Sequence, residues 1–532
     1  MNRDGPSALT APAPIRRWPH PGIVVAALLI ALFAYAILSL ASHATSAGFA
    51  VVFSPYVGSL LQASLIQVSL STLLSLLLGA LVALAVARRG NHLVARAFRA
   101  FLLTAAVAPT IVLVLGVVTV YGRAGWAAAA LQSIGVGSWP SIYGLPGILI
   151  AHVALNASYA ARIYLHALDQ VPPEHHRIAA IYGLSPAQIF RQCDWPALKR
   201  ETPGLAALIM LLCFTSFAVV LTLGGGPRYA TLEVAIYEAL RVEVDFGRAG
   251  LLAILQVAIS AAFVLATGRM IRAEPVGETS GRAIARADAA MRGLRIADVC
   301  VLALVAACLA PVLFAPLGGI TAASHLIDRD VAQAFMTSIT VAVPASALCV
   351  LFALALATHS VAAPRGAFFA AAPMLALAVP PFALIAGLYV PLRRFADMTT
   401  LAYVLTPLVN AIIALPFAFR LIEPAARLSR ARYGKLAAQL GLSGLNHLRI
   451  VDAPILRRPV IAAFAMALAL SLGDFGVAAL FGGEEFRTLP LLLNERMGAY
   501  RMAEAQAVAL VMIIFAFLLA LATETFADAG DR

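Results

Sequence analysis

Few residues in this sequence have types and spacings that suit chemistry. His175 and His176 are adjacent, which rarely lets both rings face one metal ion, so a solvated loop is the better interpretation. Gly434 and Lys435 are followed by Leu436 rather than Ser or Thr, and no Gly stands five residues before Gly434, so the pair is not a phosphate-binding loop. With no HExxH, GxSxG or zinc-cluster pattern, we predict no catalytic residue, no metal site and no cofactor bound by this chain.

Asp474 is the one acidic residue that stands well inside a long apolar run. An ionisable group inside a membrane span is costly and usually functional. We therefore consider two roles for Asp474: a charge on a substrate pathway, or a hydrogen bond at a helix end or between helices. Ser216 occupies the matching position in an earlier run, so we name both residues as candidates for the substrate pathway, with the charge in one half of the chain only.

The composition defines the environment of these residues. Of 532 residues, 62% are hydrophobic and 12% are charged, and mean hydropathy is +0.91. Soluble chains carry about 25% charged residues, so we predict an all-α polytopic membrane protein. The net charge of +12 needs no nucleic acid, because the predicted cytoplasmic segments collect most of the Lys and Arg.

Twelve apolar runs are long enough to span a bilayer, each needing roughly 20 residues as a helix. The first is too long for a cleaved signal peptide, so we expect it to be retained, with both termini cytoplasmic. The runs lie at 22–41, 57–87, 100–122, 143–166, 203–223, 249–268, 298–318, 333–358, 366–390, 401–419, 459–481 and 503–523. They form two sets of six, separated by a polar segment at 269–295.

The two sets match each other at a fixed offset of 258 residues without a gap. Since six spans separate equivalent points, the repeats are parallel and both matched loops face the cytoplasm. The matched residues are Arg162 and Arg420, Ala179-Ala180 and Ala437-Ala438, Gly183-Leu184-Ser185 and Gly441-Leu442-Ser443, Arg191 and Arg449, Asp194 and Asp452, Pro196 and Pro454, Leu198 and Leu456, Arg200 and Arg458, Phe217 and Phe475, and Gly224-Gly225 and Gly482-Gly483.

Each matched loop predicts two short helices. One helix ends at Gly183, and a second begins after Ser185 as N-cap and Pro186 at N1, then reaches about Cys193 before Pro196. On the second helix Ala187, Phe190 and Cys193 share a face, as do Leu445, Leu448 and Val451 in the other copy. Such a stripe can enter a groove on a partner, or it can pack on the chain's own span ends.

These loops resemble the EAA loop of ABC-importer permeases, in which a coupling helix contacts the ATP-binding subunit. The resemblance assigns ATPase coupling to Ala179, Ala180, Gly183, Phe190, Arg191, Pro196, Ala437, Ala438, Gly441, Leu448, Arg449 and Pro454. It implies a type I permease fold in which two modules, 1–268 with a loop at 171–200 and 296–532 with a loop at 425–458, are fused through the linker at 269–295. The family's Glu position falls on Arg177 and Lys435, so its role is left unassigned.

The segments Cys213 to Pro227, Thr231 to Leu240, Ser471 to Gly482 and Phe486 to Pro490 resemble the thiamine permeases of bacterial importers. The resemblance implies transport of thiamine and its phosphates across the bacterial inner membrane, with a periplasmic binding protein and two copies of an ATP-binding subunit that carries ATP and Mg. Asp474 would then attract the thiazolium cation. Fused ferric-iron permeases share the architecture, and an ion-coupled secondary transporter or a membrane scaffold are the alternatives from other classes.

Overall fold

The computed structural model describes residues 21–43, 51–90, 92–135, 139–267, 286–362, 366–442 and 444–528. Its described residues form helices and no strand, which confirms the predicted all-α class. Long apolar runs adopt helices in a bilayer because a helix satisfies its own backbone hydrogen bonds. The linker residues 269–285 and Ser443 lie outside the described residues.

The helices divide into two sets in chain order. The first set is α1 (Pro21–His43), α3 (Pro55–Arg89), α4 (Leu93–Val107), α5 (Thr110–Tyr121), α6 (Trp126–Ser133), α7 (Leu145–Asp169), α8 (Pro173–Ile181), α9 (Pro186–Ile189), α10 (Trp195–Phe214), α11 (Ala218–Leu223), α12 (Leu232–Arg241) and α13 (Phe246–Thr267). The second set is α14 (Arg292–Phe314), α15 (Arg329–Ala362), α16 (Gly366–Ala378), α17 (Pro381–Leu392), α18 (Met398–Gln439), α19 (Gly444–His447), α20 (Ala453–Leu472), α21 (Gly476–Phe481), α22 (Leu489–Gly498) and α23 (Met502–Asp528).

Ten helices in the described part of the chain are long and apolar enough to cross a membrane, rather than the twelve predicted. The two runs at 203–223 and 366–390 are helical but interrupted, so neither contains one long apolar helix. The runs at 100–122 and 459–481 are interrupted as well. The four breaks separate α4 from α5, α10 from α11, α16 from α17 and α20 from α21.

Proline explains two of these breaks. Pro109 and Pro380 each precede the second helix of the pair, where a residue without a backbone N–H cannot continue the hydrogen-bond ladder. The breaks after Phe214 and Leu472 fall at equivalent repeat positions, before Phe217 and Phe475. Interrupted backbone at membrane depth is tolerated only where protein buries it or a cavity solvates it, so these segments are expected in the interior.

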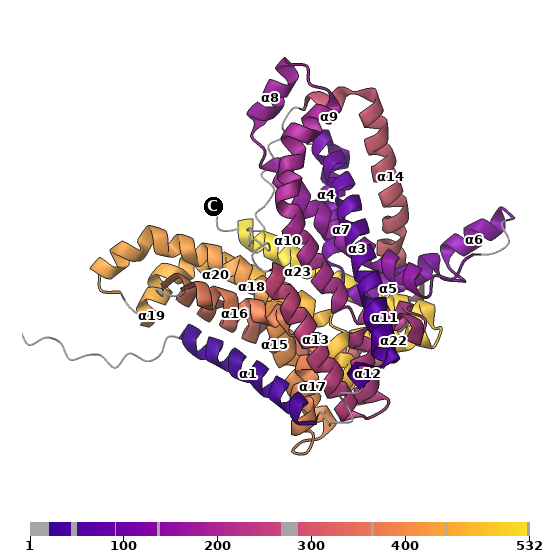
Figure 1. Cartoon of the computed structure of the whole chain (residues 1–532), viewed down its shortest axis with the longest axis vertical. Helices are drawn as coiled ribbons and strands as arrows, with labels where there is room; N and C mark the ends of the chain where they lie inside the picture. Colours follow the sequence, from indigo (N-terminus) through magenta and orange to yellow (C-terminus); the bar gives the residue numbers. More distant parts are fainter. Residues whose placement is uncertain are drawn as a thin grey trace, which may run out of the picture.

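The two modules diverge toward their predicted cytoplasmic ends (Figure 1). The end with α8 and α9 lies at the top of the view, whereas the end with α19 lies at the far left. Helices α11, α12 and α17 gather near the lower part of the molecule, where the modules meet; α12 contacts both α17 and α21. The matched loops are therefore far apart, whereas α11, α12 and α17 lie close together.

Each module also lends its first long helix to the other. Helix α1 packs against α15 and α17, and α14 packs against α3 and α5. Glycines permit these close approaches: a Cβ at Gly387 of α17 would collide with Ala36 of α1, and one at Gly116 of α5 would collide with Val312 of α14. Small residues at such contacts are typical of helix pairs in membranes.

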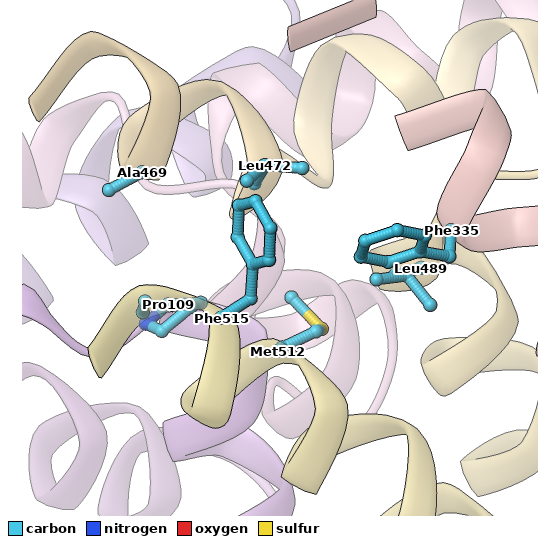
Figure 2. Close-up of a pocket in the computed structure, with 8 residues that line it drawn as sticks. Pro109, Phe335, Ala469, Leu472, Leu489, Met512 and Phe515 are labelled. Carbon is cyan, nitrogen blue, oxygen red and sulfur yellow. The ribbon is translucent and has the colours of Figure 1, made fainter. Parts of the chain in front are cut away.

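An apolar pocket lies where the first module's Pro109 meets the second module (Figure 2). Its lining residues are Pro109, Phe335, Ala469, Leu472, Leu489, Met512, Phe515 and Ala516. Because all eight are apolar, the pocket offers no group that would recognise a charged molecule.

Candidate functional site

Both matched loops turn at the same glycine, in the same way. In the first loop the N–H of Gly183 donates to the carbonyl of Ala180 at 3.2 Å, and that of Leu184 donates to Ala179 at 3.0 Å. In the second loop Gly441 and Leu442 donate to Ala438 and Ala437 at 3.1 and 2.9 Å. This pair of bonds is the Schellman C-cap, in which the backbone carbonyls of the two alanines accept from the glycine and from the residue after it. The glycines have φ of 59° and 66°, a region that favours glycine over residues with a side chain.

The chain leaves each turn through a helix that contains one π turn. The π turns span Phe190–Asp194 and Leu448–Asp452, again 258 residues apart. They continue directly into α10 and α20, so the prediction that the second helix stops before Pro196 is wrong. The N–H of Trp195 bonds to the carbonyl of Phe190 five residues earlier, and this wider turn accommodates the prolines at 196 and 454 near the start of the next helix.

The π turn also changes which side chains face inward. Ile189 and Cys193 are buried against Ala179, whereas Ala187 is exposed and Phe190 is half-buried. The predicted stripe of Ala187, Phe190 and Cys193 is therefore wrong as a single face. The inward side chains pack within the loop itself, on Ala179 and Leu184, rather than on the span ends that the sequence offered as the alternative.

Two exposed apolar residues occupy the same positions in both loops. One lies about one helical turn before the glycine, and the other directly precedes the glycine. In the first loop Ile178 is 51% exposed and Tyr182 is 77% exposed. Their equivalents in the second loop, Leu436 and Leu440, are 52% and 65% exposed. Their i, i+4 spacing puts each pair on one helix face. An exposed basic residue directly precedes each pair, Arg177 in the first loop and Lys435 in the second. Two equivalent apolar patches with basic borders thus face outward from the two separated ends.

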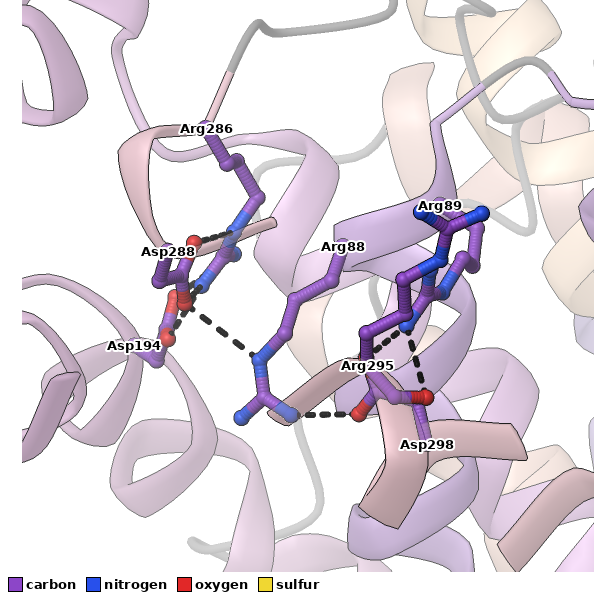
Figure 3. A network of polar contacts seen from close by, with 7 residues as sticks. All are labelled: Arg88, Arg89, Asp194, Arg286, Asp288, Arg295 and Asp298. Carbon is purple, nitrogen blue, oxygen red and sulfur yellow. Dashed lines mark hydrogen bonds and ion pairs between the residues drawn. The ribbon is translucent and has the colours of Figure 1, made fainter. Parts of the chain in front are cut away.

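A buried ion cluster fixes the first loop to the C-terminal end of the linker (Figure 3). Both guanidinium N–H groups of Arg286 donate to Asp194, at 2.9 and 2.7 Å, in a bidentate pair. Arg286 also donates to Asp288 at 3.1 and 3.0 Å. The exposed fraction of the side chain is 4% for Arg286, 0% for Asp194 and 2% for Asp288.

The cluster extends to the first helix of the second module. Arg88 donates to Asp288 at 3.3 Å and to Asp298 of α14 at 2.6 Å, and Arg89 donates to Asp298 at 2.8 Å. Elements from α3, the first loop, the linker end and α14 are therefore joined by one set of charges.

The electrostatics of the cluster favour the charged form of Asp288 and the neutral form of His176. Burial opposes the charge of Arg286, but the hydrogen bonds that Arg286 donates to Asp288 and Asp194 outweigh the effect of burial and raise the pKa of Arg286. Burial likewise opposes ionisation of Asp288, yet the bond and charge of Arg286 hold its pKa below the usual value. His176 lies beside them, and burial together with the positive charge of Arg286 lowers its pKa.

The second loop is held differently. Asp452, the equivalent of Asp194, accepts from Ser429 Oγ at 2.7 Å and lies 3.0 Å from His447 Nδ1. Ser429 belongs to α18, which continues unbroken from the membrane into the loop. In the first module Pro172 and Pro173 separate α7 from α8, so the first loop lacks that rigid extension and has the arginine cluster instead.

Asp474 and Ser216 lie in the breaks of α20/α21 and α10/α11, among other matched polar residues. Ser216 Oγ is 2.9 Å from His152 Nε2, and His152 Nδ1 is 3.1 Å from Ser71 Oγ. Asn410, the equivalent of His152, donates to Ser471 Oγ at 2.9 Å. The Oδ2 atom of Asp474 is buried without a hydrogen-bond partner in the described structure. Asn156 of α7 likewise donates to Cys213 Sγ of α10 at 3.3 Å, so each module has one interhelical hydrogen bond from an asparagine.

The structure thus brings the predicted loop residues together within each loop, but the first loop, at α8 and α9, lies far from the second, at α19 (Figure 1). Sequence reasoning missed Arg286, for which no motif signals a partner. It also missed the exposed pairs Ile178/Tyr182 and Leu436/Leu440. Both positions are apolar in each copy of the 258-residue repeat, and this pattern could have identified them.

Comparison with known proteins gives matches over nearly the whole chain. A family model described as the binding-protein-dependent transport system inner membrane component matches residues 75–273. The thiamine transport system permease protein of Brucella melitensis is 38% identical over 506 residues, which cover 93% of this chain and 92% of the relative. The proteins of the same name from Escherichia coli K12 and Haemophilus influenzae are 35% and 31% identical, over 94% and 96% of this chain and 95% and 96% of theirs.

Proposed function

Since this chain belongs to the family of binding-protein-dependent inner membrane permeases that includes the thiamine transport system permeases, we propose that it is the membrane-spanning subunit of an ATP-driven thiamine importer. The observation that carries the proposal is the similarity along both modules to relatives named as thiamine permeases. A ferric-iron permease of the same architecture is disfavoured by those names, and an ion-coupled transporter by the family.

Energy is supplied from outside this chain. We assign ATP hydrolysis, with its ATP and Mg, to a separate ATP-binding subunit that docks on the loops. Two copies are proposed because the structure presents two equivalent apolar patches, Ile178/Tyr182 and Leu436/Leu440, at the same loop geometry. An amphipathic helix face of this kind suits a groove on a partner. The basic borders of the patches favour an acidic rim on that groove.

Alternating access follows from the diverging modules. When the ATP-binding subunits close, the two loops approach each other, and the ends that meet in this structure separate. ATP drives the change to the extent that it binds the closed state more tightly than the open one. The binding protein delivers substrate on the side opposite the loops. This orientation places the loops and both chain termini in the cytoplasm, in agreement with the charge distribution of the sequence.

Uptake of radiolabelled thiamine at nanomolar concentration tests the substrate. Cells that lack this chain should lose uptake and regain it with the wild-type chain, but not with a chain in which both Tyr182 and Leu440 are replaced by Asp. Unchanged uptake in the deletion strain would remove thiamine as the substrate, and ferric iron would then be measured by the same design.

A further inference from the structure

Four aromatic rings from both modules meet at the two equivalent helix breaks. Phe217 and Phe475, which occupy the same repeat position, stack with centroids 5.6 Å apart and planes 22° from parallel. Phe382, directly after the α16/α17 break, lies 4.4 Å from Phe217. Tyr237 of α12 lies 5.1 Å from Phe217 and 6.0 Å from Phe382. We name these four residues the ring cluster.

The ring cluster lies on the boundary between the modules. Phe217 and Tyr237 belong to the first module, and Phe382 and Phe475 to the second. A molecule that passes between the modules must therefore separate these rings. Tyr237 lies in α12, Phe382 in α17 and Phe217 directly before α11. These three helices gather away from the splayed loop ends at α8 and α19 (Figure 1), so the ring cluster belongs to the region where the modules converge.

Two carboxylates border the ring cluster, and neither has an equivalent in the other module. A Cβ built on Gly476 would lie 3.4 Å from Phe382, 3.6 Å from Phe217 and 3.8 Å from Asp474 Oδ1, so the Asp474 carboxylate borders the same space as two of the rings. Glu233 precedes Tyr237 by one helical turn and faces Gln256 and the backbone of Phe382. Glu233 is 0% exposed, and neither of its oxygens has a hydrogen-bond partner among the described residues.

This chemistry suits one class of molecule. Aromatic faces attract cations, with most effect where water is excluded, and they also stack on flat rings. Asp474 keeps one buried oxygen, Oδ2, without a partner, while its carboxylate also meets the backbone N–H groups of Val477 and Ala478. A buried carboxylate oxygen without a hydrogen-bond partner is unfavourable until a cation or a donor reaches it. The apolar pocket of Figure 2 has none of these features.

We propose that the ring cluster, with Asp474 and Glu233, is the site through which a flat, positively charged heterocycle crosses between the modules. The proposal rests on the proposed function and specifies where the permease recognises its substrate. Phe217 and Phe475 are the closing pair, and the two carboxylates receive the cation as the rings separate. Ser216, the repeat equivalent of Asp474, is engaged with His152 and has no such part.

The test uses proteoliposomes that contain the full chain, the ATP-binding subunit and the binding protein, with thiamine as the transported probe. The readout is thiamine imported per ATP hydrolysed. The chain carries Asp474→Asn, Glu233→Gln or both, with Asp474→Glu as the variant that keeps the charge. Phe335→Leu is the matched aromatic control, because Phe335 pairs with Phe515 at 5.6 Å in the apolar pocket, away from the ring cluster.

We expect Asp474→Asn and Glu233→Gln to lower the import ratio by about tenfold or more, since a unit charge at contact distance is worth at least that much at the dielectric of a protein. Asp474→Glu should recover most of the ratio, and Phe335→Leu should keep it. Phe217→Leu and Phe475→Leu should let thiamine leak without ATP.

An unchanged ratio in the double variant, with wild-type import intact, would overturn the proposal while leaving the thiamine function in place. If the wild-type chain imports another cargo instead of thiamine, the proposed function fails, and the ring-cluster proposal fails with it if that cargo is neutral or anionic.

Discussion

Replacing Arg286 by Ala should release the first loop from the body of the protein while leaving the second loop unchanged. Arg286 is the only described residue that forms an ion pair with Asp194, whose side chain is 0% exposed. Asp288 keeps Arg88 at 3.3 Å after the substitution, so Asp194 alone is left as an uncompensated buried charge.

The size of the effect follows from that single orphaned carboxylate. Removing one partner of a buried ion pair destabilises by roughly 3–5 kcal/mol. The loop is joined to α7 only through Pro172 and Pro173, so we expect the loss to appear as local opening of the loop rather than as global unfolding. At about 1.4 kcal/mol per factor of ten, the opening equilibrium should rise about 100-fold or more.

Hydrogen exchange on the complete chain in detergent measures this opening. Backbone amides of Ile178–Leu184 and of 189–198 should lose protection in Arg286→Ala, and those of the equivalent segment 436–456 should not. The double variant Arg286→Ala/Asp194→Ala should regain much of the protection, because no buried charge is then left unpaired. If exchange of the first loop in Arg286→Ala equals that of the wild type, the ion cluster does not hold the loop and our reasoning is refuted.

Three further predictions concern the same loops. Gly183→Val and Gly441→Val should each destabilise their turn by roughly 1–2 kcal/mol, because the backbone is left-handed while the space around each glycine is open. ATPase activity should then become uncoupled from uptake. Normal coupling in both variants would refute the role of the glycine turns in coupling. Tyr182→Asp and Leu440→Asp should each weaken binding of the ATP-binding subunit about tenfold or more without changing the Tm of the isolated chain, since both side chains are exposed. If titration gives both variants the affinity of the wild-type chain, these residues are not part of the contact. Finally, protection of the first loop should fall as pH drops below about 6.5, the ordinary value for histidine, because the docked loop holds the pKa of His176 below it and protonation therefore favours the undocked state. Asp288, whose pKa is lowered, adds to that loss only in strongly acidic solution. A pH-independent opening equilibrium, after correction for intrinsic exchange, would contradict the assignment to His176.

The sequence predicted the fold class, the location of the apolar helices and the glycine turns, because each depends on short-range patterns. Apolar length, the 258-residue repeat and the Ala-Ala-x-x-Gly spacing are all visible along the chain. Helix continuity was harder to predict: Pro109 and Pro380 interrupt spans, whereas Pro344 and Pro407 lie inside continuous helices. Packing against neighbouring helices decides whether a proline interrupts a helix, and that packing cannot be read from a single sequence.

Long-range contacts between non-equivalent residues were the other gap. Asp194 and Asp452 match in the repeat, yet one is paired with an arginine 92 residues away and the other with a serine 23 residues away. Similarly, the repeat identified Phe217 and Phe475 as equivalent, but only the structure places them against each other and against Phe382.

The exchange of first helices explains why it matters that the two modules are one chain. With α1 packed on α15 and α17 of the second module and α14 on α3 and α5 of the first, each half covers part of the other's apolar surface. Separately made halves would therefore have to find each other in the bilayer. A continuous chain replaces that search with a high effective concentration, on the order of millimolar for short tethers. It also fixes the composition of the pair: two copies of the second half would bring two Asp474 carboxylates together, and two copies of the first would bring none. Fusion therefore lets the halves diverge in sequence, because each is always assembled with its complement and never with itself.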